Sequence, residues 1–173
     1  MGNAKPDLLA LNIALLTVSD TRRIDTDSSG AYLEDAIRAA GHHTQQRLIL
    51  PDDRYRIRAQ VAIWIADPQV RVVIVSGGTG FTGRDSTPEA IAPLLDKEMP
   101  GFGEQFRALS FAEIGTSSLQ SRAFAGIANA TFVFALPGST GACKTAWEQL
   151  IKAQLDARTK PCNLVGLIPR LHE

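Results

Sequence analysis

A glycine-rich loop is the feature of the sequence that most strongly suggests chemistry. SGGTG, at residues 76–80, directly follows the apolar run RVVIV at residues 71–75. Glycine permits conformations in which several backbone N–H groups converge on an anion, although a plain glycine-rich turn is the alternative. The loop is neither a Walker A motif nor the GxGxxG dinucleotide fingerprint. The residues expected to bind a phosphate group are Gly77, Gly78, Thr79 and Gly80.

Charged residues follow this loop and extend the prediction. Arg84 could clamp a phosphate, and Asp85 could hold a Mg²⁺ ion that accompanies phosphates. Asp85 could equally do no more than favour the start of a helix. Ser86 and Glu89 have the spacing of a capping box, and Pro88 suits a first helical turn. A helix that begins here would further favour bound phosphate.

Carboxylates also follow two earlier segments of the chain. Asp52 and Asp53 come directly after Pro51, and Asp25 and Asp27 lie in a polar stretch after residue 18. Acidic residues are common in turns and loops for structural reasons alone. Taken without further context, these four residues therefore indicate ordinary turns.

Hydroxyl groups mark two more candidate binding loops. Thr17 and Ser19 stand at the end of the apolar run at residues 11–18, where they could bind a polar ligand or cap a turn. PGSTG, at residues 137–141, follows another apolar run and is a second candidate anion-binding loop. Lys144, one helical turn later, could reach a phosphate.

The elements that must position these loops can be predicted from apolar patterning. Apolar runs of strand length alternate with helical segments, which is typical of parallel βαβ units with helices on both faces of the sheet. Ser28 or Ser29 is the expected N-cap of the first helix, which ends at Gly41. The expected strands cover residues 11–18, 44–50, 71–75 and 131–136, and further helices are expected at 55–66, 88–97, 103–112, 118–128 and 141–157.

This arrangement predicts where a ligand would bind. In an open α/β sheet, ligands bind beyond the carboxyl ends of the strands. The loops after residues 18, 75 and 136 all leave such ends, and all are rich in Ser, Thr, Gly and Asp. The absence of an internal repeat or linker indicates a single domain.

Composition limits the possible classes of protein. The chain has 173 residues with 18 Lys and Arg against 18 Asp and Glu, so it lacks the basic excess of proteins that bind nucleic acid or anionic membranes. Two cysteines without a CxxC motif favour a reducing compartment. We find no signal peptide and no membrane span, and we therefore expect a cytoplasmic location.

Four motifs in order resemble the MoaB/MogA family of molybdenum cofactor biosynthesis. They are TVSDT at residues 17–21, SGGTGFTGRDSTPEA at 76–90, EMPGFGEQFR at 98–107 and LPGS at 136–139. SFAEIGTSSLQSRA and GSTGACKTAWEQL are most similar to the MoaB branch. The resemblance divides the chain into a flexible N-terminal arm at residues 1–10, a MoaB/MogA-like molybdopterin-binding domain at 11–160 and a C-terminal tail at 161–173.

The resemblance implies a fold and an activity. The fold would be a three-layer αβα sandwich around a mostly parallel sheet, assembled as a homotrimer or homohexamer. The activity would be molybdopterin adenylyltransferase: AMP passes from Mg-ATP to the terminal phosphate of molybdopterin, and pyrophosphate is released. ATP, Mg²⁺, molybdopterin and other proteins of the pathway are the implied partners.

The resemblance also implies roles for individual residues. Asp52 and Asp85 would be catalytic, and together with Asp27 they would hold the metal. The resemblance implies that Thr17, Ser19, Gly77, Gly78, Thr79, Gly80, Ser121 and Arg122 bind substrate. The chemistry of their loops adds Arg84, Pro137, Gly138 and Ser139 to the expected substrate-binding residues.

One departure from the family pattern keeps a second function open. Many active members carry PGNP or PGxP where this chain has Thr140 after Pro137-Gly138-Ser139. A non-catalytic molybdopterin carrier or an oligomeric scaffold is therefore the alternative. A nucleotide-binding oxidoreductase is disfavoured because GxGxxG is missing.

Phe102, Phe106 and Phe111 are expected at the subunit interface, because exposed apolar patches mark interfaces.

Overall fold

A six-stranded, mostly parallel sheet forms the centre of the computed structural model, which describes residues 7–171. The strand order is β2-β1-β3-β6-β5-β4, and only β5 runs antiparallel to its neighbours β6 and β4. The strands are β1 (Asn12–Val18), β2 (His43–Leu50), β3 (Val72–Ser76), β4 (Lys97–Glu98), β5 (Phe124–Ala128) and β6 (Thr131–Leu136).

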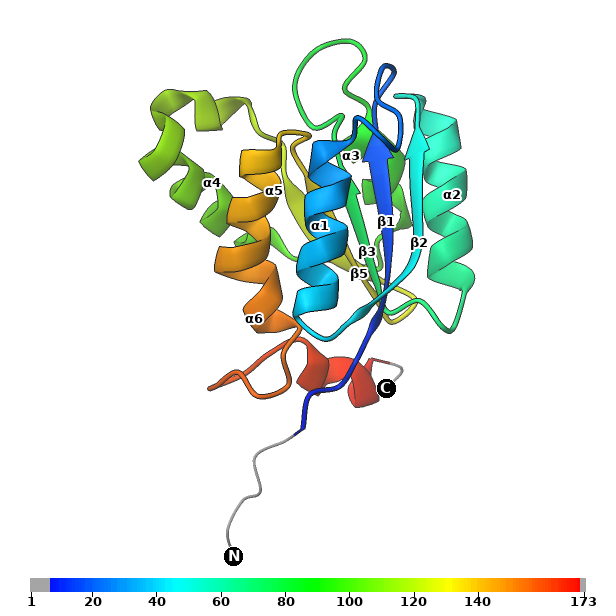
Figure 1. The fold of residues 1–173 in the computed structure, drawn as a ribbon, viewed down its shortest axis with the longest axis vertical. Helices are drawn as coiled ribbons and strands as arrows, with labels where there is room; N and C mark the ends of the chain where they lie inside the picture. Colours follow the sequence, from blue (N-terminus) through cyan, green and yellow to red (C-terminus); the bar gives the residue numbers. More distant parts are fainter. Residues whose placement is uncertain (1–6, 172–173) are drawn as a thin grey trace, which may run out of the picture.

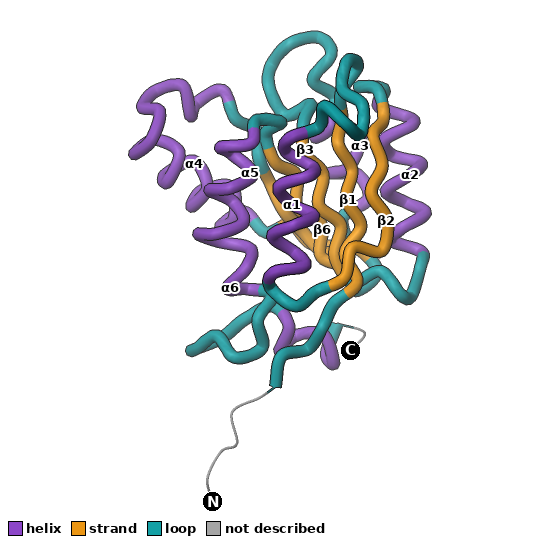
Figure 2. The backbone as a smooth tube through the Cα atoms, viewed as in Figure 1, coloured by secondary structure: helices purple, strands orange, loops and turns teal. Residues whose placement is uncertain are grey.

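Helices cover both faces of this sheet, as Figures 1 and 2 show. They are α1 (Ser28–Ala39), α2 (Arg54–Ala66), α3 (Thr87–Ile91), α4 (Pro100–Ile114), α5 (Thr140–Ala146) and α6 (Lys152–Gln154). Shorter helical segments are η1 (Ala92–Leu94), η2 (Gly115–Gln120), the π-helical turn η3 (Trp147–Ile151) and η4 (Val165–Arg170). Helices α1, α4 and α5 pack on one face and α2 and α3 on the other, which confirms the predicted three-layer sandwich.

Alternating side chains of the central strands fill two separate cores. In β1, Leu15 packs with Leu33 of α1 and with Trp147 on one face, whereas Leu16 packs with Val61 of α2 on the other. A strand whose two faces are both buried is built mainly from apolar residues. This explains why residues 11–18 are apolar except at Asn12 and Thr17.

Strand register brings the predicted ligand-binding loops together. Thr17 in β1 pairs with Ser76 in β3, and Ser76 pairs with Leu136 in β6. The loops after three adjacent parallel strands therefore leave the same edge of the sheet. The strand order also reverses direction between β1 and β3, which is the switch point at which open α/β sheets bind ligands.

The predicted helix at residues 118–128 is wrong. The 3₁₀ helix η2 ends at Gln120, and β5 then pairs antiparallel with β6 as a hairpin. Asn129 and Ala130 both have positive φ, at 45° and 60°, as a two-residue hairpin turn requires. The segment is short and apolar, and pairing with β6 outweighs its helical periodicity.

The predicted helix at residues 88–97 is shorter than expected. Helix α3 ends at Ile91 and tightens into the 3₁₀ helix η1, which contains Pro93. Proline has no backbone N–H and cannot continue an α-helical ladder. The chain then enters β4 at the edge of the sheet, where the Asp96 N–H donates to the Ile127 carbonyl at 2.8 Å.

Two of the three phenylalanines expected at an interface lie in the core instead. Phe102 and Phe106, four residues apart on α4, face the sheet, and the rings of Phe102 and Phe134 meet edge to face at 5.2 Å. Residues at this spacing share one face of a helix. Phe111 lies on the other side of α4 and is 58% exposed.

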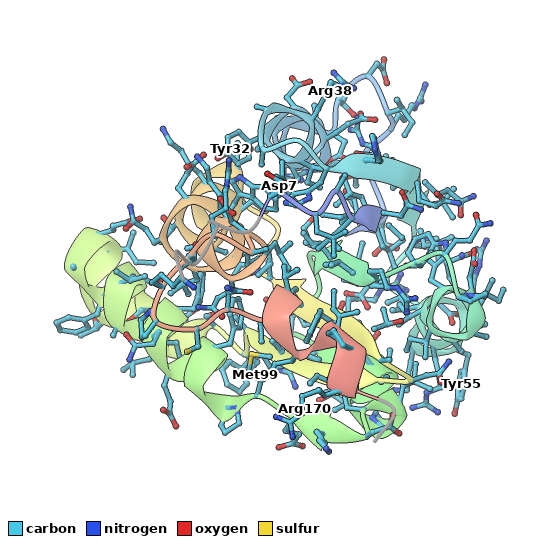
Figure 3. The ribbon with its side chains drawn as sticks, turned by 90° about the horizontal axis from the view of Figure 1, so that it is seen from below. Asp7, Tyr32, Arg38, Tyr55, Met99 and Arg170 are labelled. Atoms are coloured by element: carbon cyan, nitrogen blue, oxygen red, sulfur yellow. The ribbon has the colours of Figure 1, made fainter. Side chains whose placement is uncertain are left out.

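The described part of the predicted tail contributes to the fold. Leu164 and Val165 are buried against the first core, and η4 lies at the lower end of the molecule in Figure 1 and in the foreground of Figure 3. Residues 1–6 of the predicted arm lie outside the described residues. Between residues 7 and 171, no helix is long and apolar enough to span a membrane.

Candidate functional site

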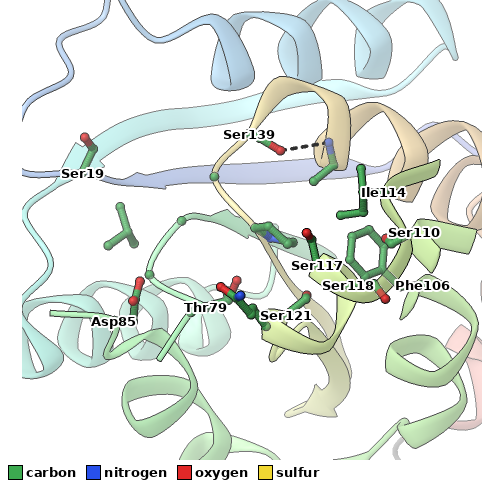
Figure 4. A pocket seen from close by; sticks show the side chains of 18 of the residues that line it. Ser19, Thr79, Asp85, Phe106, Ser110, Ile114, Ser117, Ser118, Ser121 and Ser139 are labelled. Atoms are coloured by element: carbon green, nitrogen blue, oxygen red, sulfur yellow. Dashed lines mark hydrogen bonds between the residues drawn. The ribbon is translucent and has the colours of Figure 1, made fainter. Parts of the chain in front are cut away.

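A cavity of about 440 Å³ opens at the edge of the sheet where β1, β3 and β6 end (Figure 4). The loops after these strands form one wall, and α4 with η2 forms the other. The predicted residues that line the cavity are Ser19, Gly77, Gly78, Thr79, Gly80, Asp85, Ser121, Pro137, Gly138 and Ser139. Thr17, Asp27, Asp52, Arg84 and Arg122 are predicted residues that do not line it.

The loop after β3 requires glycine for both conformation and space. Gly77 and Gly78 have φ values of +105° and +64°. A Cβ atom on Gly77 would lie 2.2 Å from the Val18 carbonyl oxygen, and one on Gly78 would lie 2.6 Å from Asp52 Oδ2. At Gly80 it would lie 2.8 Å from an oxygen of Asp85. The two predicted catalytic carboxylates therefore both touch this loop.

Asp52 reaches the loop through Ser86. The Ser86 N–H and hydroxyl both donate to Asp52 Oδ1, at 3.1 and 2.5 Å. The predicted capping box is consequently wrong: Ser86 is the N-cap of α3, but its hydroxyl makes no bond to the helix, and Glu89 pairs with Arg122. Oδ2 of Asp52 remains outside the bonds with Ser86 and faces Gly78.

Asp85 is held at the cavity by its own loop. The backbone N–H and hydroxyl of Thr82 donate to Asp85 Oδ2 at 2.8 and 2.6 Å. Partial burial acts to raise the pKa of Asp85, but the bonds from Thr82, the Gly80 N–H and the charge of Arg122 together outweigh it and hold the pKa below its ordinary value. Asp85 is therefore an ionised carboxylate at neutral pH.

Asp27 has a different environment. It is 1% exposed and is the N-cap of α1, where the prediction placed Ser28 or Ser29. Its two oxygens accept from the Thr17 hydroxyl, the Ser29 hydroxyl and the Gly30 N–H, and Arg47 pairs with it at 3.0 Å. Burial favours the neutral acid, but these partners hold the pKa of Asp27 below its ordinary value.

These environments decide which carboxylates suit a divalent cation. Asp52 and Asp85 each keep one oxygen outside the bonds with Ser86 and Thr82. Both oxygens of Asp27 are already occupied by protein donors, so Asp27 does not fit. Residues 7–171 hold no cluster of three or more His, Cys, Asp or Glu arranged for a metal. A cation here would complete its coordination with phosphate oxygens and water, as Mg²⁺ commonly does.

The two predicted substrate-binding arginines lie outside the cavity. Arg84 is 67% exposed and pairs with Asp20 at 2.6 Å. Arg122 donates to the carbonyl oxygens of Gly80 and Asp85, at 2.7 and 2.8 Å, and also pairs with Glu89. Arg122 is thus a positioning residue, because it ties η2 and β5 to the loop after β3.

The loop after β6 begins helix α5. The Ser139 hydroxyl accepts from the Ala142 N–H at 3.2 Å, as Figure 4 shows, and Thr140 shares a hydrogen bond with Ser28 at 2.8 Å. Lys144 lies beside a separate hollow rather than the cavity. Burial raises the pKa of Cys143 to about 12, so this thiol is not a nucleophile at neutral pH.

The sequence did not predict two parts of the cavity. One is Arg22, whose Nη1 donates to the Ser29 hydroxyl at 2.5 Å and to the Gly138 carbonyl at 3.0 Å. Its place three residues after Ser19, in the loop after β1, was the available signal. The other is most of the α4–η2 wall, whose segments carry family motifs but, apart from Ser121, gave no prediction of a binding residue. Packing brings this wall opposite the loops, and its remaining lining residues are Phe106, Ser110, Ile114, Ser117, Ser118 and Gln120.

The sequence is similar to a family and to individual proteins of molybdenum cofactor biosynthesis. A family model described as a probable molybdopterin binding domain matches residues 14–157. Molybdenum cofactor biosynthesis protein B of Escherichia coli is 56% identical over 163 residues, covering 94% of this chain and 96% of that protein. The protein of the same name from Bacillus subtilis is 44% identical over 151 residues, covering 87% and 88%.

Solved structures agree with the sequence comparison. A crystal structure of a molybdenum cofactor biosynthesis protein B has a TM-score of 0.87 and 38% identity, covering 96% of this chain and 99% of that one. The tungsten cofactor synthesizing protein MoaB from Pyrococcus furiosus has a TM-score of 0.73 and 38% identity, with coverage of 84% and 92%.

Proposed function

Because this chain belongs to the MoaB/MogA family of molybdenum cofactor biosynthesis proteins, we propose that it binds molybdopterin in the cavity and adenylylates its terminal phosphate with Mg-ATP. The observation that carries this proposal is the position of Asp52 and Asp85. Both carboxylates touch the glycine loop that forms one wall of the cavity. This arrangement suits the joining of two phosphate-bearing substrates beside a cation.

The cavity suits a pterin in size and polarity. Its volume of about 440 Å³ falls within the range of about 300–1,000 Å³ found for small-molecule sites. Phe106 and Ile114 provide apolar surface, and several serine hydroxyls on the same wall can bind heteroatoms of a planar ring (Figure 4). The glycine loop on the opposite wall would bind phosphate.

The proposed reaction needs little acid–base help. An oxygen of the pterin phosphate attacks the α-phosphorus of ATP, a phosphoanhydride bond forms, and the bond to the leaving pyrophosphate breaks. The nucleophile is already anionic, so repulsion between the two substrates is the main barrier. N–H groups of Gly78 to Gly80 would hold phosphate in line for attack.

Asp52 and Asp85 are the residues that would hold Mg²⁺. A bound Mg²⁺ ion would neutralise part of the phosphate charge. The two side chains would fix its position relative to the glycine loop, and neither would act as a general base. Asp27 instead organises the start of α1 and is left out of the proposed metal site.

An assay of pyrophosphate release tests the proposed transfer. The protein is mixed with molybdopterin, ATP and Mg²⁺, and we expect pyrophosphate release that requires all three. Tight molybdopterin binding without release would reject the enzyme and support the carrier. Thr140, which stands where many active members have proline, is the observation that favours the carrier.

We also propose a homotrimer or homohexamer that works in the cytoplasm with other proteins of the pathway. The large exposed apolar side chains of α4 and η2 support self-association: Phe111, Ile114 and Leu119 are 58%, 57% and 72% exposed. Cys143 and Cys162 are both free thiols, in keeping with a reducing compartment.

A further inference from the structure

Charge is distributed unevenly around the cavity. Of the described residues that line it, Arg22 and Asp85 are the two with charged side chains. Asp85 lies beside Gly80 in the loop after β3, whereas Arg22 is bonded to Gly138 in the loop after β6. One part of the cavity therefore carries a cation and another a carboxylate.

Arg22 is fixed in place but is not saturated. Its Nη1 donates to the Ser29 hydroxyl and the Gly138 carbonyl, and lies 3.5 Å from Asp27. Among the described residues, every hydrogen bond from its guanidinium starts at Nη1, and the side chain is 30% exposed. Because guanidinium has five donors, Nε and Nη2 remain able to bind an oxyanion in a forked geometry.

We propose that Arg22 binds the phosphate of the pterin substrate, and so sets the direction in which the pterin lies in the cavity. This inference rests on the proposed pterin site and adds a phosphate-binding residue to it. The phosphate lies near Gly138 and Ser139, where positive charge attracts it. The pterin ring lies toward the neutral wall formed by α4 and η2.

Comparison of the arginines near the site supports this assignment. Arg84 is neutralised by Asp20 on the surface, and the donors of Arg122 are committed to Gly80, Asp85 and Glu89. Asp27, which lies 3.5 Å from Arg22, also pairs with Arg47 at 3.0 Å. Arg22 therefore shares its counter-ion and retains charge for a ligand.

A pair of matched ligands tests the proposal. A pterin whose side chain ends in a phosphomonoester is compared with the same pterin ending in a free hydroxyl, and binding is followed by pterin fluorescence. Wild-type protein should prefer the phosphorylated ligand. Arg22→Gln should reduce that preference by about tenfold to a hundredfold, the scale of a charged hydrogen bond, and should leave affinity for the hydroxyl ligand unchanged.

Two further variants control for side effects. Arg23→Gln removes the same charge from the adjacent, exposed position and should retain the wild-type preference. Arg22→Lys keeps the charge and should retain part of the preference for the phosphorylated pterin. The ratio of the two affinities is measured on one sample, so it does not depend on the fraction of folded protein.

The outcomes separate this inference from the function on which it rests. If wild-type protein binds both pterins equally, or if Arg22→Gln weakens both equally, Arg22 does not bind the phosphate, although the pterin site stands. If wild-type protein binds neither pterin, the proposed pterin site is rejected and the role of Arg22 is rejected with it.

Discussion

At the level of single residues, Asp52 lies against Gly78 and Asp85 lies against Gly80 in the glycine loop. Asp→Asn at either position removes a charge with little change in volume. We expect AMP transfer to fall by roughly a hundredfold, the scale of losing one electrostatic stabiliser. Molybdopterin affinity should change little, because neither carboxylate holds its phosphate. Single-turnover AMP transfer and molybdopterin binding, measured for each variant, check this.

Asp53 provides the matched control for these substitutions. It is adjacent to Asp52, but its side chain caps α2 by accepting from the Tyr55 and Arg56 N–H groups, both at 2.9 Å. Asn caps helices as well as Asp does, so Asp53→Asn should transfer AMP at the wild-type rate. Wild-type transfer in both Asp52→Asn and Asp85→Asn would reject their catalytic role.

The burial of His42 predicts that the stability of the fold depends on pH. It is buried, and its Nδ1 accepts from the Leu11 N–H at 3.2 Å. Burial lowers the pKa of His42 below its ordinary value, and nearby Asp156 only partly opposes this. The unfolded chain therefore takes up the proton first as pH falls, so this contribution to stability is complete above about pH 6.5 and is lost below it.

Urea unfolding at pH 7.5 and pH 5.5 measures this effect. The wild-type protein should lose more stability between these two values than His42→Asn, which cannot titrate. Equal losses in wild type and His42→Asn would show that His42 does not couple folding to protonation.

At the scale of elements, Arg122 joins the segment after η2 to the loop between β3 and α3. Its guanidinium donates to the carbonyls of Gly80 and Asp85 and packs against the Phe81 ring at 5.3 Å. Lysine carries the charge but not the planar fork, so Arg122→Lys should loosen this loop. We expect faster amide exchange at residues 77–86 and at least about tenfold slower AMP transfer, since each charged hydrogen bond contributes about 1.5–3 kcal/mol.

Arg107 offers the same substitution at a site away from that loop. Its Nη1 donates to the Ala123 carbonyl at 2.9 Å rather than to the loop, and it lines a hollow beside Arg122, outside the cavity. Arg107→Lys should leave exchange at residues 77–86 unchanged. Unchanged exchange in Arg122→Lys as well would mean that Arg122 does not hold the loop.

At the scale of the whole molecule, exposed apolar side chains on α4 and η2 predict self-association. Light scattering should give a trimer or hexamer, and Phe111→Asp should lower the mass by placing a charge in the contact. Tyr55→Asp is the matched control, because Tyr55 is an exposed aromatic residue of α2, remote from α4 (Figure 3). A wild-type mass near 18.6 kDa at every concentration would contradict the prediction.

The central architecture could be predicted from the sequence, because local patterns there agree with the tertiary environment. β1 and β3 are apolar over residues 13–16 and 72–75, which both helical layers cover, and buried polar residues begin at Thr17 and Ser76, near the ends of those strands. Gly77 and Gly78 in the loop after β3 have positive φ, a backbone conformation that the local sequence already indicates. The three-layer fold and most of the residues lining the cavity could therefore be predicted.

Structural roles that depend on distant partners could not be predicted from local sequence. Residues 124–128 are a strand because β6 offers hydrogen bonds, and Phe102 is buried because α4 turns it toward Phe134. Asp27 and Asp85 are both acidic residues of loops that follow strands. In the structure, Asp27 is bonded to Arg47 and to the start of α1, whereas Asp85 lines the cavity. Long-range contacts assign such roles, and residue type and spacing do not encode them locally.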